Sequence, residues 1–265
     1  MYKYGFIGMG NMGSAMLAGI KKSYGRDSVI FSEHDYGKMK KKAEKEQIKF
    51  AETNAEVVRE SKYIILAVKP VVYDKVIKEI REELDYSKVL ISIAPGIKIC
   101  ELKALAGEDV RIVRAMPNTP AMVGEGMTGV CYDENEFSDT EINEIEAFFS
   151  SFGKMCKIDE KLMSAVTCAS GSSPAYVYMF IEALADSVVK YGMPRASAYE
   201  FVAQTVLGSA KMVLETGEHP GKLKDNVCSP GGTTIAAVEA LEENGMRNAL
   251  FKATEKCYRK CEHLD

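Results

Sequence analysis

One short segment near the amino terminus limits most strongly what this chain can fold into. It follows an apolar, strand-like run, Tyr4–Gly8, opens a helix-like segment, and reads Gly8-Met9-Gly10-Asn11-Met12-Gly13. In such a turn the first glycine permits the tight bend, the second leaves room for a pyrophosphate, and the third lets the helix pack closely on the strand. The positive end of the helix attracts phosphate groups. The segment therefore predicts a strand, turn and helix that bind a dinucleotide.

Up to about residue 158, short apolar runs alternate with longer charged segments of helical periodicity, which is typical of a parallel sheet covered by helices. The predicted strands are Tyr4–Gly8, Ser28–Ser32, Tyr63–Val68, Lys88–Ile93, Val110–Ala115 and Lys154–Ile158. The predicted helices are Asn11–Lys22, Lys38–Glu46, Tyr73–Glu83, Ile99–Leu105 and a segment from a capping box at Ser138 to Gly153. The fold class expected for this part is doubly wound α/β.

The strand signal stops after that point, and the rest of the chain is predicted to be all helical. Its helices are expected at Tyr176–Lys190, Arg195–Glu215 and Gly232–Tyr258. We therefore expect two domains, residues 1–160 and residues 161–265. The helix Tyr176–Lys190 is apolar on nearly every side, whereas a surface helix needs only one apolar stripe. A second chain is expected to cover it, which predicts an obligate dimer.

Turn segments follow several predicted strands at their carboxyl ends, where ligands sit in open α/β sheets. After the second strand, Glu33 can bond a ribose 2′-hydroxyl and would repel a 2′-phosphate, which favours NADH. Ser32 and the lysines 38, 40, 41 and 42 favour a 2′-phosphate, although such a charged run is usually a solvated helix face. The choice between NADPH and NADH stays open. Further contacts are expected from Ala67-Val68-Lys69-Pro70 and Ala94-Pro95-Gly96, and Asn118 and Thr119 lie in a turn stiffened by two prolines.

Two small-residue segments are predicted to open helices in the second half of the chain. They are Ser170-Gly171-Ser172-Ser173-Pro174 and Ser229-Pro230-Gly231-Gly232-Thr233-Thr234. The second offers backbone N–H groups and hydroxyls at a positive helix end, which suits a carboxylate or a polar substrate nitrogen. Ordinary helix capping by serine or threonine remains the alternative at this point.

Composition excludes several classes of function. A net charge of −4 leaves no basic excess for nucleic acid or an anionic membrane, and no apolar stretch approaches the length of a membrane span. Seven dispersed cysteines without a C-x-x-C pair indicate reduced thiols and no metal site, and we expect a cytoplasmic protein. Three histidines, none beside a plausible nucleophile, disfavour hydrolysis.

Over essentially its whole length the chain resembles pyrroline-5-carboxylate reductase. The resemblance rests on the glycine-rich opening and on Ala67-Val68-Lys69-Pro70, Arg114-Ala115-Met116-Pro117-Asn118-Thr119-Pro120, Ser170 to Tyr176 and the stretch from His219 to Thr234. It implies a Rossmann-type sheet domain, an all-helical dimerisation domain, homodimers or larger assemblies of dimers, and reduction of 1-pyrroline-5-carboxylate to L-proline, usually with NADPH. Glu33 departs from the family pattern, in which a small hydroxyl residue is common.

The resemblance also implies the residues of the site. Cofactor contacts map onto Gly8, Met9, Gly10, Asn11, Met12, Asn54, Ala67, Val68, Lys69, Pro70, Ala94, Gly96 and Asn226, in addition to Ser32 and Glu33, which follow from their place after the second predicted strand. Substrate contacts map onto Ser229, Gly231, Gly232, Thr233, Thr234 and Glu160. Thr234 is expected to donate or relay a proton to the imine nitrogen, and no strong base is needed because a protonated imine accepts hydride.

Two other functions compete with this interpretation. A β-hydroxyacid dehydrogenase begins with a similar glycine-rich strand, but it needs a lysine at the entry of its helical domain, and Ser170 to Ala175 offers none. The other is a protein that binds a dinucleotide and senses redox state without catalysis.

Overall fold

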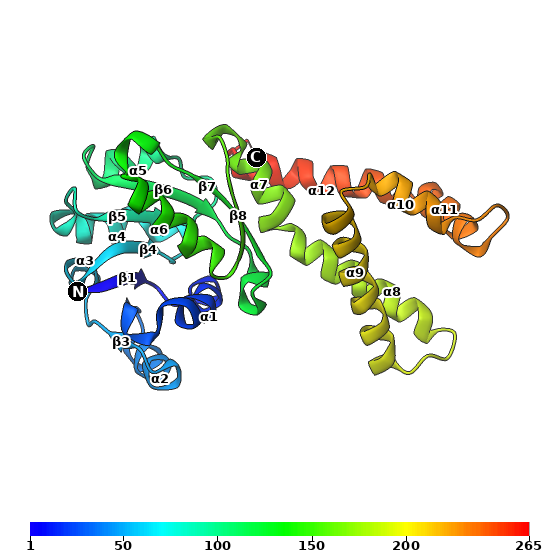
Figure 1. Cartoon of the computed structure of the whole chain (residues 1–265), viewed down its shortest axis with the longest axis horizontal. Helices are drawn as coiled ribbons and strands as arrows, with labels where there is room; N and C mark the ends of the chain where they lie inside the picture. Colours follow the sequence, from blue (N-terminus) through cyan, green and yellow to red (C-terminus); the bar gives the residue numbers. More distant parts are fainter. Residues whose placement is uncertain (265) are drawn as a thin grey trace. The chain divides into compact units, whose positions relative to one another are not determined.

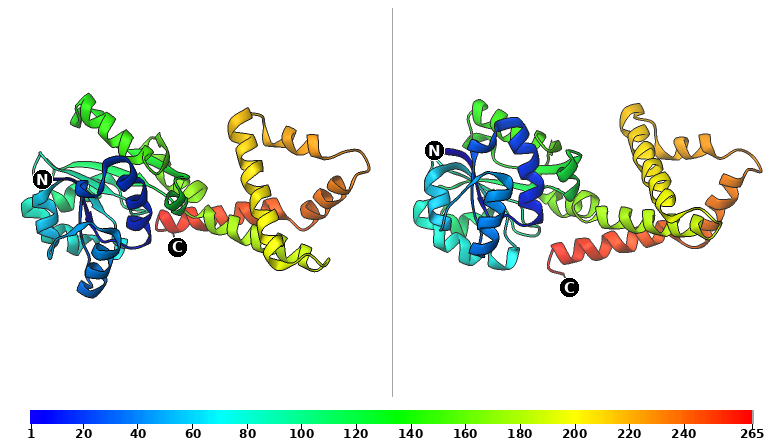
Figure 2. Two further views of the ribbon diagram at one scale, coloured as in Figure 1. Left: turned by 60° about the horizontal axis from the view of Figure 1, so that its bottom comes forward. Right: turned by 90° about the horizontal axis from the view of Figure 1, so that it is seen from below.

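The computed structural model describes residues 1–264, and its contacts divide the chain into two compact units (Figure 1). Unit 1 comprises Met1–Ser172 together with the described residues from Tyr258 onward. Unit 2 comprises Ser173–Cys257 and contains helices only (Figure 2).

Within the described residues of unit 1, eight strands form one sheet in the order β3-β2-β1-β4-β5-β6-β7-β8. Their bounds are β1 Tyr2–Ile7, β2 Val29–Ser32, β3 Lys49–Phe50, β4 Ser61–Leu66, β5 Val89–Ser92, β6 Arg111–Met116, β7 Gly126–Cys131 and β8 Gly153–Lys157. All pairs are parallel except β6 with β7. The chain runs outward from β1 in one direction and returns through β4 in the other. The sheet is therefore doubly wound as expected, with its switch point between β1 and β4.

Helices cover both faces of this sheet (Figure 2). On one face, α1 (Asn11–Tyr24), α2 (Tyr36–Glu46) and α6 (Asp139–Ser150) bury side chains such as Met16, Met39 and Phe148. On the other, α3 (Asn54–Glu60), α4 (Tyr73–Ile80) and α5 (Ile99–Ala106) bury side chains such as Val57, Ile77 and Leu102. With both faces covered, the strands can be apolar throughout, which is the pattern that predicted them.

The elements of unit 1 that were not expected from the sequence include β3, β7 and α3. The strand β3 has two residues, and β7 contains Gly126 and Gly129, so neither carries an apolar pattern that marks a strand. The helix α3 is short, but its start does carry a signal, because the Thr53 hydroxyl accepts a hydrogen bond from the Glu56 N–H at 3.1 Å.

The helical run that leads from unit 1 into unit 2 corrects one prediction. Ser173 and Pro174 open α8 (Ser173–Val189) as expected, but Ser170 and Gly171 lie in a π-helical turn, Thr167–Gly171, that follows α7 (Met163–Val166). The Asn118 side chain donates a hydrogen bond to the Ser170 carbonyl at 3.0 Å. A turn of this kind leaves a carbonyl without its usual helical partner, and Asn118 satisfies it.

Unit 2 consists of α8, α9 (Arg195–Thr216), α10 (Pro220–Val227), α11 (Thr233–Glu243) and most of α12 (Met246–Cys261). The expected single helix Gly232–Tyr258 is wrong: Gly245, with a φ of 72°, ends α11 and separates it from α12. The helix α10 was also not expected. The buried cluster of the unit consists of the small side chains Ala185, Ala198 and Val202.

Large apolar side chains of unit 2 are exposed in the single chain. They include Tyr178, Met179 and Phe180 on α8, Phe201, Leu207 and Leu214 on α9, and Leu250 and Phe251 on α12. Exposed apolar side chains gathered in this way mark a protein interface. The helix α8 packs on α9 through Ala185 but leaves Tyr178, Met179 and Phe180 uncovered by its own chain, in line with the sequence prediction that a second chain covers it.

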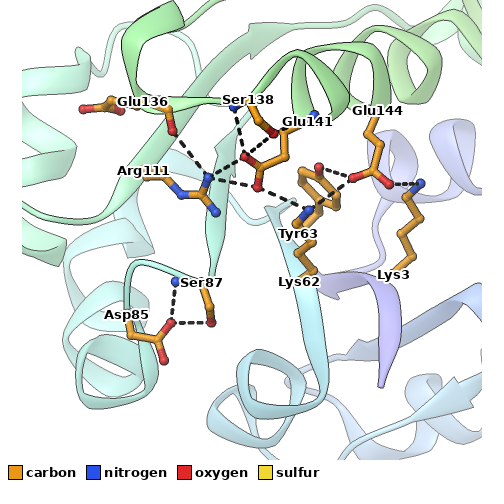
Figure 3. A network of polar contacts seen from close by, with 10 residues as sticks. All are labelled: Lys3, Lys62, Tyr63, Asp85, Ser87, Arg111, Glu136, Ser138, Glu141 and Glu144. Carbon is orange, nitrogen blue, oxygen red and sulfur yellow. Dashed lines mark hydrogen bonds and ion pairs between the residues drawn. The ribbon is translucent and has the colours of Figure 1, made fainter.

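Charged side chains at the amino ends of β1, β4 and β6 form a network with α6 (Figure 3). Lys3 lies 2.8 Å from Glu144, and the Tyr63 hydroxyl donates to Glu144 at 2.6 Å. Arg111 donates to both carboxylate oxygens of Glu141, at 2.9 and 3.0 Å. This network lies at the strand ends opposite to the glycine-rich turn, and its contacts join α6 to β1, β4 and β6.

Because of this network, we expect the free energy of unfolding to decrease as the pH falls into the acid range. Burial alone would raise the pKa of Glu141 and Glu144, but hydrogen bonds from the Ser138 N–H and Arg111 to Glu141, and from Lys3 and Tyr63 to Glu144, lower each to about 2. Stabilisation from a lowered pKa is complete above the unfolded value of 4.5 and is lost as the pH falls towards 2. We expect the free energy of unfolding, measured with urea at fixed protein concentration, to fall by roughly 2–4 kcal/mol between about pH 5 and pH 3.

A double variant, Glu141→Gln with Glu144→Gln, is the control for this prediction. It should be less stable than the parent at neutral pH and should lose less stability over the same acid range. An identical acid dependence in parent and variant would show that other carboxylates govern it.

Candidate active site

Of the three glycines in the glycine-rich turn, Gly10 is the one with open space beside it. An added Cβ at Gly8, whose φ is 87°, would lie 2.7 Å from Val68 Cγ1, and one at Gly13 would lie 3.1 Å from the Gly8 carbonyl oxygen. At Gly10 an added Cβ would meet no described atom within 4 Å. Gly10 is the N-cap of α1 and carries no side-chain cap, so the free N–H groups of the helix start border this space.

A cavity of about 350 Å³ adjoins the turn, between the ends of β1 and β2 and the start of α3. Its lining includes Gly8, Ser32, Glu33, Asn54 and Val68, which the sequence assigned to the cofactor. The Ser32 hydroxyl donates to the Asn54 side-chain oxygen at 2.6 Å. The Asn54 amide in turn donates to Glu79 at 3.0 Å. These hydrogen bonds hold the Ser32 and Asn54 side chains in place, so this side of the cavity is already ordered for a polar ligand.

Glu33 contacts the glycine-rich turn directly. Its carboxylate accepts hydrogen bonds from the Met9 N–H at 3.0 Å and from its own neighbour, the His34 N–H, at 3.1 Å. The structure shows that Glu33 ties the end of β2 to the turn after β1, while its contact with a ribose hydroxyl stays a prediction.

A second cavity, of about 500 Å³, lies on the other side of Glu33 and is lined by lysines of α2. Lys38, Lys41, Lys42 and Lys45 line it together with Gly10. Their spacing of three, four and seven residues places them on one face of the helix. Lys40 does not line this cavity. Helical spacing in the sequence could have shown that Lys40 lies on a different face of the helix from the other lysines.

A third cavity, of about 340 Å³, lies in unit 1 beside the turn after β5. Gly96, Lys98, Arg114, Glu160 and His263 are among its lining residues. The Arg114 guanidinium lies 2.9 Å from Glu160, and the Ile99 N–H donates to the same carboxylate at 2.7 Å. Sequence reasoning gave neither this ion pair nor the proximity of His263 to Gly96, because the partners are far apart in the chain.

The remaining predicted residues are not among the residues that line these cavities. Lys69 and Pro70 are exposed directly after β4, and Asn226 is exposed on α10. Asn118 accepts a hydrogen bond from the Met127 N–H at 2.9 Å while it holds the π-helical turn, so it links β6, β7 and that turn.

The segment Ser229 to Thr234 belongs to unit 2 and opens α11. Gly231 has a φ of 67°, and Gly232 is the N-cap of the helix without any side-chain cap hydrogen bond. Ordinary capping by serine or threonine is therefore not what the structure shows. An added Cβ at Gly232 would collide with the Ser229 hydroxyl. The start of α11 thus keeps backbone N–H groups and the hydroxyls of Thr233 and Thr234 at a positive helix end.

Among residues 1–264, no group of three or more histidine, cysteine, aspartate or glutamate side chains could hold a metal ion. No helix in the same range is long and apolar enough to cross a membrane.

Comparisons with known proteins converge on one family. The family model described as pyrroline-5-carboxylate reductase dimerisation matches residues 160–264, and the one described as NADP oxidoreductase coenzyme F420-dependent matches residues 3–96. The pyrroline-5-carboxylate reductase of Escherichia coli is 47% identical over 99% of this chain and 98% of its own length. That of Arabidopsis thaliana is 40% identical over 99% and 95%. The solved structure of the Plasmodium falciparum enzyme with NADP bound has a TM-score of 0.89 at 35% identity, covering 99% of this chain and 97% of that one.

Proposed function

The chain belongs to the pyrroline-5-carboxylate reductase family, and from this premise we propose how its residues share the work of the reaction. It is an oxidoreductase that reduces 1-pyrroline-5-carboxylate to L-proline with NAD(P)H and forms a homo-oligomer through its dimerisation segment. Neither a β-hydroxyacid dehydrogenase nor a sensor without catalysis is then needed to explain the glycine-rich turn.

The open space at Gly10 carries the proposal for the cofactor. A pyrophosphate placed there would lie against the uncapped N–H groups of α1, which suit an anion. The adenosine half would then extend into the cavity bounded by Ser32 and Asn54, and the nicotinamide half towards Ala94 and Gly96. The bound nicotinamide supplies the hydride.

The start of α11 carries the proposal for the substrate. The Gly231 N–H and the N–H groups of the first turn of α11 would hold the substrate carboxylate at the positive helix end, while the Gly232 N–H donates to the Ser229 carbonyl at 3.0 Å. The Thr234 hydroxyl would donate or relay a proton to the imine nitrogen, with Thr233 and Ser229 completing the polar wall. A positioned proton donor suffices because protonation alone makes the imine carbon electrophilic.

Two further predictions belong to this proposal. The division into a dinucleotide-binding domain of residues 1–160 and a dimerisation and substrate domain of residues 161–265 is supported by the family match that begins at residue 160, whereas the compact units divide after Ser172 and assign the described residues from Tyr258 onward to unit 1. A cytoplasmic location is supported by the exposed or partly buried free thiols Cys100, Cys156 and Cys228, since cysteines stay reduced in that compartment.

Glu33→Ser is expected to shift the cofactor preference towards NADPH. The carboxylate stands between the adenosine cavity and the lysine-lined cavity, so its removal leaves Lys38, Lys41 and Lys42 free to attract a 2′-phosphate. We expect the ratio of kcat/KM for NADPH to kcat/KM for NADH to rise roughly 5-fold or more, equal to about 1 kcal/mol. Steady-state reduction of 1-pyrroline-5-carboxylate with each cofactor measures this ratio.

Glu52→Ser is the matched control, because Glu52 lines the same adenosine cavity but lies outside the end of β2. It should change the ratio less than Glu33→Ser does. Equal shifts in both variants would mean that the preference follows the overall charge of the cavity and that Glu33 has no special position.

A further inference from the structure

We propose that Arg114 and Glu160 act as a pair of positioning residues that fix the turn after β5 for hydride transfer. The proposal rests on the placement of the nicotinamide beside Ala94 and Gly96 described above. It gives Glu160 a different role from the substrate contact that the sequence resemblance implied.

The Arg114 side chain is held inside unit 1 by a single carboxylate. It projects from β6, only 6% of its surface is exposed, and its guanidinium lies 2.9 Å from Glu160 Oε1. A buried guanidinium is costly to leave without an anionic partner, so the pair constrains where Glu160 can lie. Glu160 itself comes from the turn after β8 and is 32% exposed.

The same carboxylate oxygen also holds the start of α5. The Ile99 N–H, the first of that helix, donates to Glu160 Oε1 at 2.7 Å. The preceding residue, Lys98, has no side-chain acceptor and cannot cap the helix. Glu160 therefore supplies from a distance of 61 residues the acceptor that the local sequence lacks. Its negative charge also suits the positive end of the helix.

Two residues separate this helix start from Gly96. Gly96 has a φ of 75°, and an added Cβ there would lie 3.1 Å from the Cys261 carbonyl oxygen, so the turn is closely confined. Because Arg114 and Ile99 bind one oxygen, any movement of the guanidinium is transmitted to the helix start and to this turn. A displacement of about 1 Å at a reacting centre costs up to about 100-fold in rate.

The test is a double-mutant cycle in the full-length dimer, with Arg114→Met, Glu160→Gln and the two combined. Each single variant breaks the same chain of contacts. We expect each to lower kcat by roughly 10- to 100-fold, and the double variant to lose no more than the worse single one. The KM for 1-pyrroline-5-carboxylate should change little. Because hydride transfer itself is slowed, the kinetic isotope effect with cofactor deuterated at the transferred position should rise.

Binding of ADP-ribose and of its 2′-phosphate, measured by calorimetry, separates this role from general damage. Both probes lack nicotinamide, so their Kd should stay within about 2-fold of the parent value in every variant. Lys161→Met is the matched control, because Lys161 lines the same cavity but pairs with Asp159. It should leave kcat unchanged.

Three results would overturn the proposal. One is additive losses in the double variant. Another is a fall in the thermal midpoint with unchanged kcat, which would make the pair purely structural. A third is a higher KM for 1-pyrroline-5-carboxylate in Glu160→Gln alone, which would place Glu160 on the substrate. Failure of the parent protein to bind ADP-ribose would instead contradict the proposed cofactor site.

Discussion

Gly10→Val is expected to abolish binding of both NADPH and NADH while the fold and the dimer stay intact. The backbone at Gly10 has a φ of −71° and a ψ of −156°, which valine adopts without strain. An added Cβ meets no described protein atom, so the new side chain fills only the space proposed for the pyrophosphate. We expect Kd to rise by roughly 1000-fold or more, equal to about 4 kcal/mol, when binding is measured by calorimetry.

Gly13→Val provides the contrast for this result. There the added Cβ would press on the Gly8 carbonyl oxygen and the Met9 sulfur, so the damage should fall on the fold and lower the thermal midpoint. Tight cofactor binding by Gly10→Val would show that the pyrophosphate does not lie over the start of α1.

Thr234→Val is expected to slow hydride transfer by roughly 10- to 1000-fold, the scale at which one positioned proton donor or hydrogen bond contributes. The variant keeps the shape of the side chain and removes only its hydroxyl. The helix start should survive, because its N-cap is Gly232 and no side-chain cap is lost. Cofactor Kd should stay within a few-fold. The loss should grow as the pH rises, because less substrate then arrives already protonated. Single-turnover kinetics across pH measure this.

Thr233→Val is the companion variant, since Thr233 is the neighbouring hydroxyl at the same helix start and is exposed. Thr233→Val should lower the rate of hydride transfer less than Thr234→Val does. If Thr234→Val matches the parent in both rate and pH profile, the proton comes from water or from Thr233.

Local sequence patterns predicted much of the sheet and one part of the site. The glycine spacing around Gly10 fixes a turn within six residues, so its geometry follows from local chain conformation. Elements that lack a local pattern were not predicted. The strand β7 has glycines at positions where a strand pattern needs apolar side chains. The π-helical turn at Ser170 depends on a contact with Asn118, 52 residues away. Pairwise contacts between distant residues leave no periodic trace in a single sequence.

Glu33 and Glu160 show that the residue type alone does not tell which partner a carboxylate binds. Glu33 was assigned to a ribose because of its charge and Glu160 to the substrate because of the family resemblance, yet each carboxylate binds a backbone N–H group of its own chain, that of Met9 and Ile99 respectively. The sequence predicts that a carboxylate stands at the site. Which donor it satisfies depends on tertiary packing, and their predicted ligand contacts remain predictions.

The small buried cluster of unit 2 has a consequence for how the protein is made. A unit whose own core consists of Ala185, Ala198 and Val202 gains too little from folding alone to offset its loss of chain entropy. Its folding must therefore be coupled to an encounter between two chains, which makes the last step second order in protein concentration. Newly made chains at low abundance would wait longest with Phe180 and Phe251 accessible, so expression level sets the time during which the protein is vulnerable to aggregation and proteolysis.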